Sequence, residues 1–353
     1  MKKVYTFKIH QRLNAQNQQF YEWLIGFTEG DGCFSLNKQK TNWVVGFKIA
    51  LHKSDIKTLI YIKKNCHCGK IEWANREQTI IQFRVRNLQH LFDFIFPIFD
   101  TYPMITNKNR DYFLIRQAAD LLYQKSQANR NKIEKLYSEL REIRKQRTLL
   151  ASLLATRVNI TDPQAYCESL GISIDWIRRS CLLENYMVKG IEGFEELCQT
   201  ASKFLSSNWI IGFFQAEGSF YVQLKDNKTN RYCCGFGIIA SNPFILEVLK
   251  RKLHIPSQIK ERLNSGKLFY QLDNTNSRAN QYMNQFCYKH LPFVGLKSLQ
   301  YRIWSRCLQS SCAKERKRVS KSTPLSLQKT QQLLRKLSKR LISNSSKVLL
   351  IKV

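Results

Sequence analysis

Acidic residues are scarce in this chain of 353 residues. It contains 57 Lys and Arg residues against 26 Asp and Glu residues, which gives a formal net charge of +31. Such an excess causes self-repulsion, which a polyanionic partner usually offsets. Nucleic acid is the first candidate, because binding to phosphates releases condensed counterions. An anionic membrane surface is the alternative explanation.

Long apolar runs and paired metal-binding cysteines are also missing. No stretch approaches the roughly 20 apolar residues that span a bilayer, and residues 1–5 lack the apolar region of a secretory signal. We therefore expect no membrane partner and no secretion. The eleven cysteines lack the C-x-x-C spacing of zinc sites and are typical of buried thiols in a reducing compartment. Cys66-His67-Cys68 is interpreted as a turn rather than a metal site.

What the chain does have is a globular composition and a duplicated motif. Hydrophobic residues make up 43% of the sequence and aromatic residues 12%, and the length allows two domains. Residues 23–32 (WLIGFTEGDG) and 209–218 (WIIGFFQAEG) match at most positions. Each is predicted to be a helix that ends at an acid and a glycine. Gly26 and Gly30, like Gly212 and Ala216, share a small-residue helix face that permits close packing of two backbones.

The segments after each motif repeat the same order of hairpin, helix, hairpin and helices. This order predicts an antiparallel sheet with helices on one face. Lys108 follows Asp31 by 77 residues and Lys297 follows Glu217 by 80. We therefore divide the chain into a first half at 1–125 (motif 24–32), a helical insert or linker at 126–203, a second half at 204–312 (motif 210–218) and a basic tail at 313–353. The insert is either a helical layer over a ligand or a spacer, and the tail either a solvated segment or a weak phosphate contact.

The two motifs resemble those of LAGLIDADG homing endonucleases of the single-chain, double-motif type, which group I introns of organelles encode. The resemblance implies an α+β fold of two pseudo-symmetric αββαββα halves, with saddle-like antiparallel sheets and a central two-helix interface. It also implies a monomer that makes a double-strand break at a long, asymmetric site in double-stranded DNA.

The proposed chemistry needs divalent metal ions, for which Mg²⁺ is the expected cofactor. Asp31 and Glu217 are the candidate catalytic acids and metal ligands, since Mg²⁺ is commonly held by one or two carboxylates with water and phosphate. The carbonyls of Gly30 and Ala216 are candidate additional ligands. The resemblance implies that Lys108 and Lys297 orient water or stabilise the transition-state phosphate. A surface acid and a phosphate-anchoring lysine are the simpler alternatives.

Polar residues on the open face of the sheets are the candidates for reading DNA. Strand alternation places one set of side chains on this face, where Arg contacts guanine and Asn or Gln contacts adenine. The candidates are Ser35, Asn37, Gln39, Lys48, Gln82, Arg84, Arg86, Tyr221, Gln223, Lys225, Gln271 and Asp273. A solvated polar face is the alternative for each of them.

Two other functions remain open from the residues alone. An RNA-binding group I intron maturase, with intron RNA as its partner, would also use the basic insert and tail. A DNA-binding module without catalysis would be favoured if metal failed to bind. The resemblance implies a location in a chloroplast or a mitochondrion, encoded within that organelle.

Overall fold

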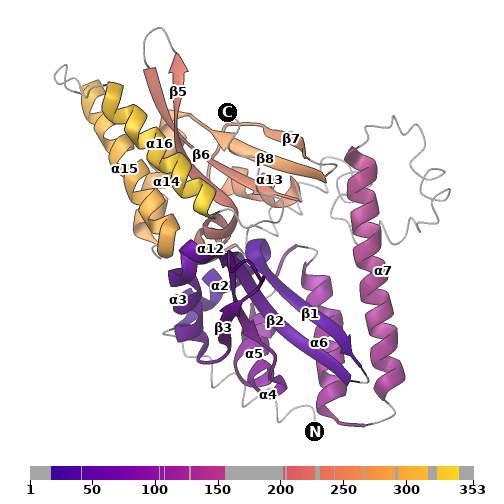
Figure 1. Ribbon diagram of the computed structural model, residues 1–353. Helices are drawn as coiled ribbons and strands as arrows, with labels where there is room; N and C mark the ends of the chain where they lie inside the picture. Colours follow the sequence, from indigo (N-terminus) through magenta and orange to yellow (C-terminus); the bar gives the residue numbers. More distant parts are fainter. Residues whose placement is uncertain are drawn as a thin grey trace.

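The computed structural model describes residues 17–316 and 324–341, except 41, 103, 107, 127–128, 156–201, 203–204, 227–230, 242, 265–266 and 291–292. Two units of the same order lie one after the other along the chain (Figure 1). The first comprises α2 (Gln18–Asp31), β1 (Gly32–Gln39), β2 (Asn42–His52), η2 (Lys53–Asp55), α3 (Ile56–Cys66), β3 (Lys70–Trp73), β4 (Ile80–Val85), α4 (Leu88–His90), η3 (Leu91–Ile95), α5 (Phe96–Thr101) and α6 (Lys108–Tyr123).

The second unit repeats the helix–hairpin–helix–hairpin order. It comprises α12 (Ser207–Glu217), β5 (Gly218–Asp226), β6 (Arg231–Ala240), α13 (Pro243–Lys252), β7 (Ile259–Asn264), β8 (Lys267–Asn274), α14 (Ser277–Lys289), α15 (Gly295–Arg316) and α16 (Pro324–Leu341). A long helix, α7 (Asn129–Ala155), follows the first unit. The further helical pieces expected between 160 and 200 lie outside the described residues.

Each unit is built on a four-stranded antiparallel sheet. The strand orders are β1-β2-β4-β3 and β5-β6-β8-β7. Alternate side chains of the strands, such as Phe34, Phe47 and Phe83, are buried under the helices, because successive residues of a strand point to opposite faces. The predicted α+β class and the duplicated sheet are thus confirmed.

The two motif helices, α2 and α12, pack against each other at the centre of the molecule (Figure 1). A Cβ atom on Gly26 would lie 2.0 Å from the carbonyl oxygen of Trp209, and one on Gly212 would lie 2.0 Å from that of Trp23. Side chains larger than hydrogen therefore cannot occupy these positions without separating the helices. The indole of Trp23 stacks on Phe27 with ring centroids 5.0 Å apart, and Trp209 repeats the arrangement in α12.

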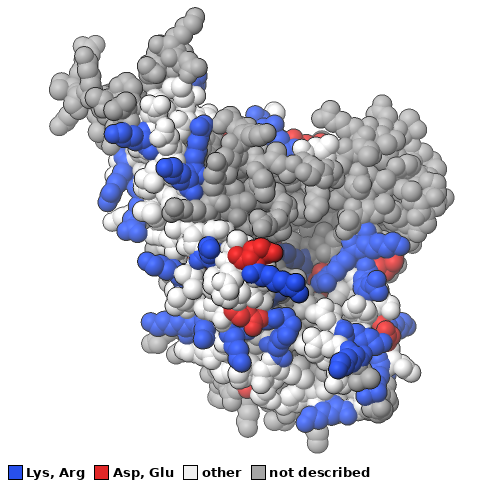
Figure 2. All heavy atoms as spheres, in the orientation of Figure 1, with Lys and Arg blue, Asp and Glu red and all other residues white. Residues whose placement is uncertain are grey.

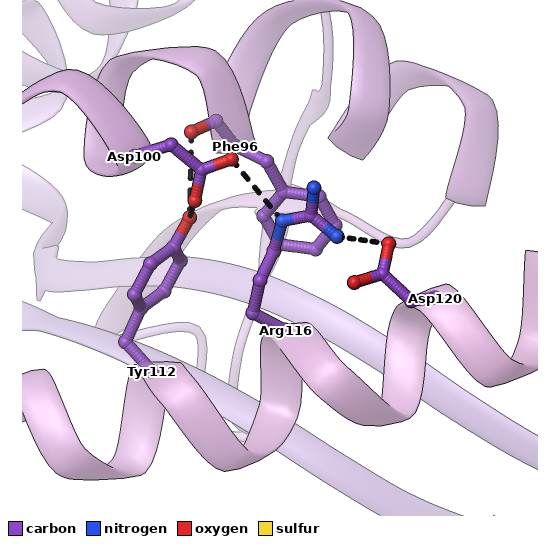
Figure 3. A network of polar contacts seen from close by, with 5 residues as sticks. All are labelled: Phe96, Asp100, Tyr112, Arg116 and Asp120. Atoms are coloured by element: carbon purple, nitrogen blue, oxygen red, sulfur yellow. Dashed lines mark hydrogen bonds and ion pairs between the residues drawn. The ribbon is translucent and has the colours of Figure 1, made fainter. Parts of the chain in front are cut away.

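Helix α6 is fixed to α5 by a network of polar contacts around the buried Tyr112 (Figure 3). The Tyr112 hydroxyl donates to the Asp100 carboxylate and, at 3.3 Å, to the carbonyl oxygen of Phe96. The Arg116 guanidinium contacts both Asp100 and Asp120 and lies 4.8 Å from the centroid of the Phe96 ring. Since Lys108 begins α6, this network also fixes the position of that lysine.

The segment 88–101 is less regular than the single helix that its apolar pattern predicts. A π-helical turn, Leu91–Ile95, separates α4 from α5. Pro97 stands at the start of α5, and a proline has no N–H to donate to the carbonyl four residues earlier. The break in regular α-helical hydrogen bonding follows from that residue.

Two helices outside the repeated order pack onto it. Helix α7 contacts α6 and also β8 of the second unit, and its Tyr137 ring lies 5.0 Å from Trp43 of β2. Part of the segment expected to be a basic tail is folded: α15 continues to Arg316, and α16 packs against β5. Leu334 and Leu337 of α16 are buried, because their spacing places both on the apolar side of an amphipathic helix. Over the described residues, no helix combines the length and apolarity needed to cross a membrane.

Candidate functional site

The two motif acids lie at the adjoining ends of α2 and α12. Asp31 is the last residue of α2 and Glu217 the last of α12. A Cβ atom on Gly30 would lie 2.4 Å from the Cβ of Ala216 and 3.0 Å from Oε1 of Glu217. The Glu217 carboxylate thus reaches across the helix interface to the residue before Asp31. The small residues at 30 and 216 allow the acids from both halves to share one site.

Each helix passes directly into a strand at its glycine. Gly32 and Gly218 have extended backbone conformations, so neither is required for a left-handed turn. A Cβ atom at Gly32 would lie 2.4 Å from the Thr28 side chain, and one at Gly218 would lie 2.2 Å from the Phe214 ring. The glycines are needed for space at the helix–strand junction, where the acids stand.

Lys108 contacts the backbone at the C-terminal end of α2. Its Nζ atom donates to the carbonyl oxygens of Thr28, Gly30 and Gly32, each at 2.9 Å. An ammonium has three donors, so these contacts use all of them. Burial lowers the pKa of Lys108, while the negative charges of Glu29, Glu217 and Asp31 raise it. The lysine therefore offsets the partial negative charge of the helix end beside both acids.

Lys297 has the corresponding place in the second half. It is 3% exposed, and its Nζ donates to the carbonyl oxygen of Gly218, the residue after Glu217. The lysine that follows each motif acid by about 80 residues therefore lies at the end of the helix that carries that acid. Both lysines contact backbone oxygens at the end of a motif helix.

Glu29 and Gln215 anchor the loops that precede the two lysines. Oε1 of Glu29 accepts from the backbone N–H groups of Ile105 and Thr106 at 2.5 and 3.1 Å. Gln215 exchanges two hydrogen bonds of 3.0 Å with the backbone of Val294. An acid and an amide hold equivalent loops, which accounts for the loss of charge between the two motifs.

Asp55 is a buried acid near the site that the sequence pattern does not single out. Its Oδ1 accepts from the backbone N–H of Leu296 at 2.8 Å, across the two halves, and its Oδ2 accepts from Thr58 at 3.0 Å. Burial raises the pKa of Asp55 to about 6, although these hydrogen bonds and Lys297 lower it. Its position before α3 indicated only a helix start, because the contact partner is 241 residues away.

The donor atoms at the junction suit a hard divalent cation. The predicted ligands are the carboxylates of Asp31 and Glu217 and the carbonyls of Gly30 and Ala216, and the Gly30 carbonyl also accepts from Lys108. Among the described residues no group of three or more His, Cys, Asp and Glu side chains gathers. Two carboxylates fit an ion such as Mg²⁺, which keeps several waters and binds substrate phosphate.

The polar candidates on the sheets lie on the face opposite the helices. Asn37, Gln39, Lys48 and Lys225 are exposed, and Ser35, Arg84, Tyr221, Gln223, Gln271 and Asp273 are half-buried. Two differ from expectation. Arg86 lies just beyond the end of β4, and Gln82 is buried, with its amide donating to Glu72 at 3.0 Å. Basic side chains (blue) clearly exceed acidic ones (red) over the part of the surface drawn in colour in Figure 2.

Comparison with known sequences gives a family match and several relatives. Residues 24–119 match the model of the LAGLIDADG endonuclease family. A Schizosaccharomyces pombe protein, "Probable intron-encoded endonuclease Cox1-I1b", is 30% identical over 83% of this chain and 65% of its own length. A Neurospora crassa protein, "Probable intron-encoded endonuclease 3", is 24% identical over 76% of this chain and 43% of its own length. The chain thus spans less than two thirds of either relative.

Solved structures share the architecture of both halves. The LAGLIDADG meganuclease I-AabMI, bound to uncleaved DNA, matches with a TM-score of 0.61 at 18% identity, over 88% of this chain and 98% of that one. The LAGLIDADG homing endonuclease I-SmaMI, bound to cleaved DNA, matches with a TM-score of 0.61 at 19% identity, over 91% and 98%. At these identities the likeness establishes a common fold.

Proposed function

We propose that the chain is a member of the LAGLIDADG endonuclease family, whose model matches residues 24–119, and that it is a site-specific homing endonuclease. It cuts both strands of a long, asymmetric target in double-stranded DNA by metal-dependent hydrolysis. The observation that carries the proposal is the convergence of Asp31 and Glu217 at the joined ends of α2 and α12. One carboxylate comes from each half, so each is assigned to one DNA strand.

Asp31 and Glu217, with the carbonyls of Gly30 and Ala216, are assigned to hold Mg²⁺. When bound, a divalent cation neutralises charge at the phosphate and makes a water molecule more acidic. The protein positions these groups before DNA arrives, because Lys108 and Lys297 fix the backbone at the two helix ends. We also assign to their positive charges the stabilisation of the negative charge that a phosphate would gain in the transition state.

DNA is assigned to the open faces of the two sheets. The strong net positive charge supplies sequence-independent attraction to phosphates, and the polar strand residues supply contacts to bases. Those residues differ between the halves, which supports an asymmetric target. The chain contains both halves of the site, so we propose that it acts as a monomer.

The RNA maturase alternative is not favoured. The two relatives described above are named as intron-encoded endonucleases, and the two structural neighbours are bound to DNA. A further relative, 25% identical, is named as a mitochondrial protein from Saccharomyces cerevisiae. We accordingly propose expression from a mitochondrial intron, in preference to a chloroplast one.

The proposal is tested by incubating the full chain with a randomised duplex library and Mg²⁺, and sequencing the cut ends. Double-strand cuts at one asymmetric site, abolished by Asp31→Asn and by Glu217→Gln, are expected. Folding of both variants is checked by circular dichroism. A wild-type chain that binds but never cuts DNA with Mg²⁺ or Mn²⁺ would contradict the assignment.

A further inference from the structure

Arg84 and Asp273 occupy equivalent positions in the two sheets. Arg84 follows Phe83, which pairs with Ile49 of β2, and Asp273 follows Leu272, which pairs with Ile238 of β6. Both side chains therefore lie on the open face, on the third strand of their sheet. A cation in the first half thus corresponds to an anion in the second.

Arg84 is held in place by an acid on the neighbouring strand. Its Nη1 atom donates to Oε1 of Glu72 at 2.6 Å, and the Gln82 amide donates to the same oxygen. The side chain of Arg84 retains 27% exposure. A guanidinium has five N–H donors, so the contact with Glu72 orients the group and leaves other donors for a base edge.

Asp273 is held in place by a tyrosine on another strand of its sheet. The Tyr221 hydroxyl donates to its Oδ1 at 2.6 Å. Two glycines on β6 make room for this pair: a Cβ atom at Gly235 would lie 2.5 Å from the Tyr221 ring, and one at Gly237 would lie 2.7 Å from Oδ1 of Asp273. The tyrosine thus lies across the middle strand and fixes the carboxylate, which leaves Oδ2 to accept from a base.

The two residues also differ in the residue that pairs with each of them on the neighbouring strand. Lys48 pairs directly with Arg84, whereas Gly237 pairs with Asp273. Burial raises the pKa of Asp273, while the Tyr221 hydrogen bond, Lys260 and Arg262 lower it. Phosphates repel a carboxylate on the face that approaches them unless cations are nearby. Lys260 and Arg262 supply these cations.

We infer that the target carries guanine opposite Arg84 and cytosine at the corresponding position opposite Asp273. Guanine presents two acceptors in the major groove, which suit a guanidinium, and cytosine presents an N4 amino donor, which suits a carboxylate. A palindromic target would repeat guanine at both positions, and its O6 and N7 atoms would face Asp273. The inference rests on the proposed function and specifies one pair of target positions that break two-fold symmetry.

The test compares the DNA preferences of the wild type and three variants, using enrichment of a randomised duplex library bound to the full chain. In Asp273→Asn, cytosine preference at one base pair is expected to fall by about 5-fold or more, with a shift toward adenine. Tyr221→Phe is expected to weaken the same preference without creating a new one. Arg84→Gln is expected to change guanine to adenine at the mirrored base pair. The unaffected half-site serves as the control within each variant, and thermal unfolding confirms folding.

The possible outcomes distinguish a failure of this inference from a failure of the proposed endonuclease function. An enriched wild-type site supports the inference if one strand carries guanine at the position read by Arg84, the other strand carries cytosine at the same distance from the centre in the other half-site, and each base is altered only by its own variant. An enriched site whose two strands carry guanine at both of these symmetry-related positions, or one that Asp273→Asn leaves unchanged, overturns the inference while leaving the endonuclease intact. A wild-type chain that enriches no site overturns both.

Discussion

The Nζ atom of Lys108 lies 2.9 Å from the carbonyl oxygen of Gly30, the residue that precedes Asp31. A lysine of α6 is thus bonded to the backbone of the motif helix instead of extending toward solvent. The same carbonyl belongs to a residue assigned to the metal site. Lys108 therefore couples the stability of the helix end to the placement of Asp31, the acid that we propose to be catalytic.

Lys108→Met is expected to lower both stability and cleavage. The apolar side chain removes the lysine donor from three carbonyls, of which that of Thr28 keeps the Gly32 N–H, and one unsatisfied buried group costs about 1–3 kcal/mol. We expect a loss of at least that size in urea unfolding. Single-turnover cleavage is expected to fall by about 100-fold or more, as for loss of a preorganised donor. An unchanged free energy of unfolding would show that the contacts of Lys108 with the carbonyls do not stabilise the fold.

Gly26→Ala is expected to separate the two motif helices. The added Cβ would meet the Trp209 carbonyl oxygen at 2.0 Å, and overpacking of this kind typically costs about 1–3 kcal/mol or more. Gly212→Ala should have a similar effect, because its Cβ would meet Trp23 in the same way. Urea unfolding measures the loss of stability in each of the two variants.

Gly46→Ala is the matched control for this experiment. The nearest atom to its Cβ would lie at 3.3 Å, in the Ser35 hydroxyl, so a much smaller loss of stability is expected. Equal losses at Gly26 and Gly46 would contradict the close approach of α2 and α12.

Asp55 is expected to make stability depend on pH. Burial raises the pKa of Asp55 from 3.8 to about 6, so the folded state takes up a proton more readily than the unfolded state. This stabilising contribution is complete below pH ~3.8 and is lost as pH rises through about 6. The loss amounts to about 3 kcal/mol for a shift of roughly two pKa units.

Asp55→Asn isolates this effect. Asparagine keeps an oxygen that accepts from the Leu296 N–H but has no carboxyl group to titrate. Over the range pH 4–7, the free energy of unfolding of the wild type should fall relative to that of the variant. Urea unfolding at each pH gives the difference, and parallel curves would rule out the raised pKa.

Leu334→Ala tests whether α16 belongs to the folded body. Leu334 is 1% exposed, and its neighbour Leu333 is 45% exposed. Removal of a buried leucine side chain costs about 2–5 kcal/mol, so Leu334→Ala should lower the midpoint of urea unfolding, whereas Leu333→Ala should leave it nearly unchanged. Equal behaviour of the two variants would indicate that α16 does not pack as described.

The repeated architecture was predictable because its signals are local. Alternation of apolar residues marks the strands, and the spacing of Gly26 and Gly30 marks a close helix contact. The repeat also gave the spacing of about 80 residues between each acid and a lysine, and the resemblance to a known family then added the pseudo-symmetry and the role of those lysines. These features depend on residue order within short segments or within one half.

Contacts between distant segments were not predictable in the same way. Nothing near Asp55 in the sequence indicates Leu296, and nothing around Lys108 indicates three backbone carbonyls as its partners. The packing of α16 was also missed, because its frequent lysines and arginines resemble a solvated tail while Leu334 and Leu337 supply a narrow apolar side. The individual roles of the residues at the site stay predictions for the experiments above.

Backbone contact between Gly26 and Trp209 has a consequence for how such a protein can diversify. The separation of the two motif acids is fixed by main-chain atoms, which do not change when side chains are exchanged. The strands that carry Arg84 and Asp273 lie outside this contact. In the proposed enzyme, recognition can therefore evolve by substitution on the sheets while the spacing between the two cuts stays constant.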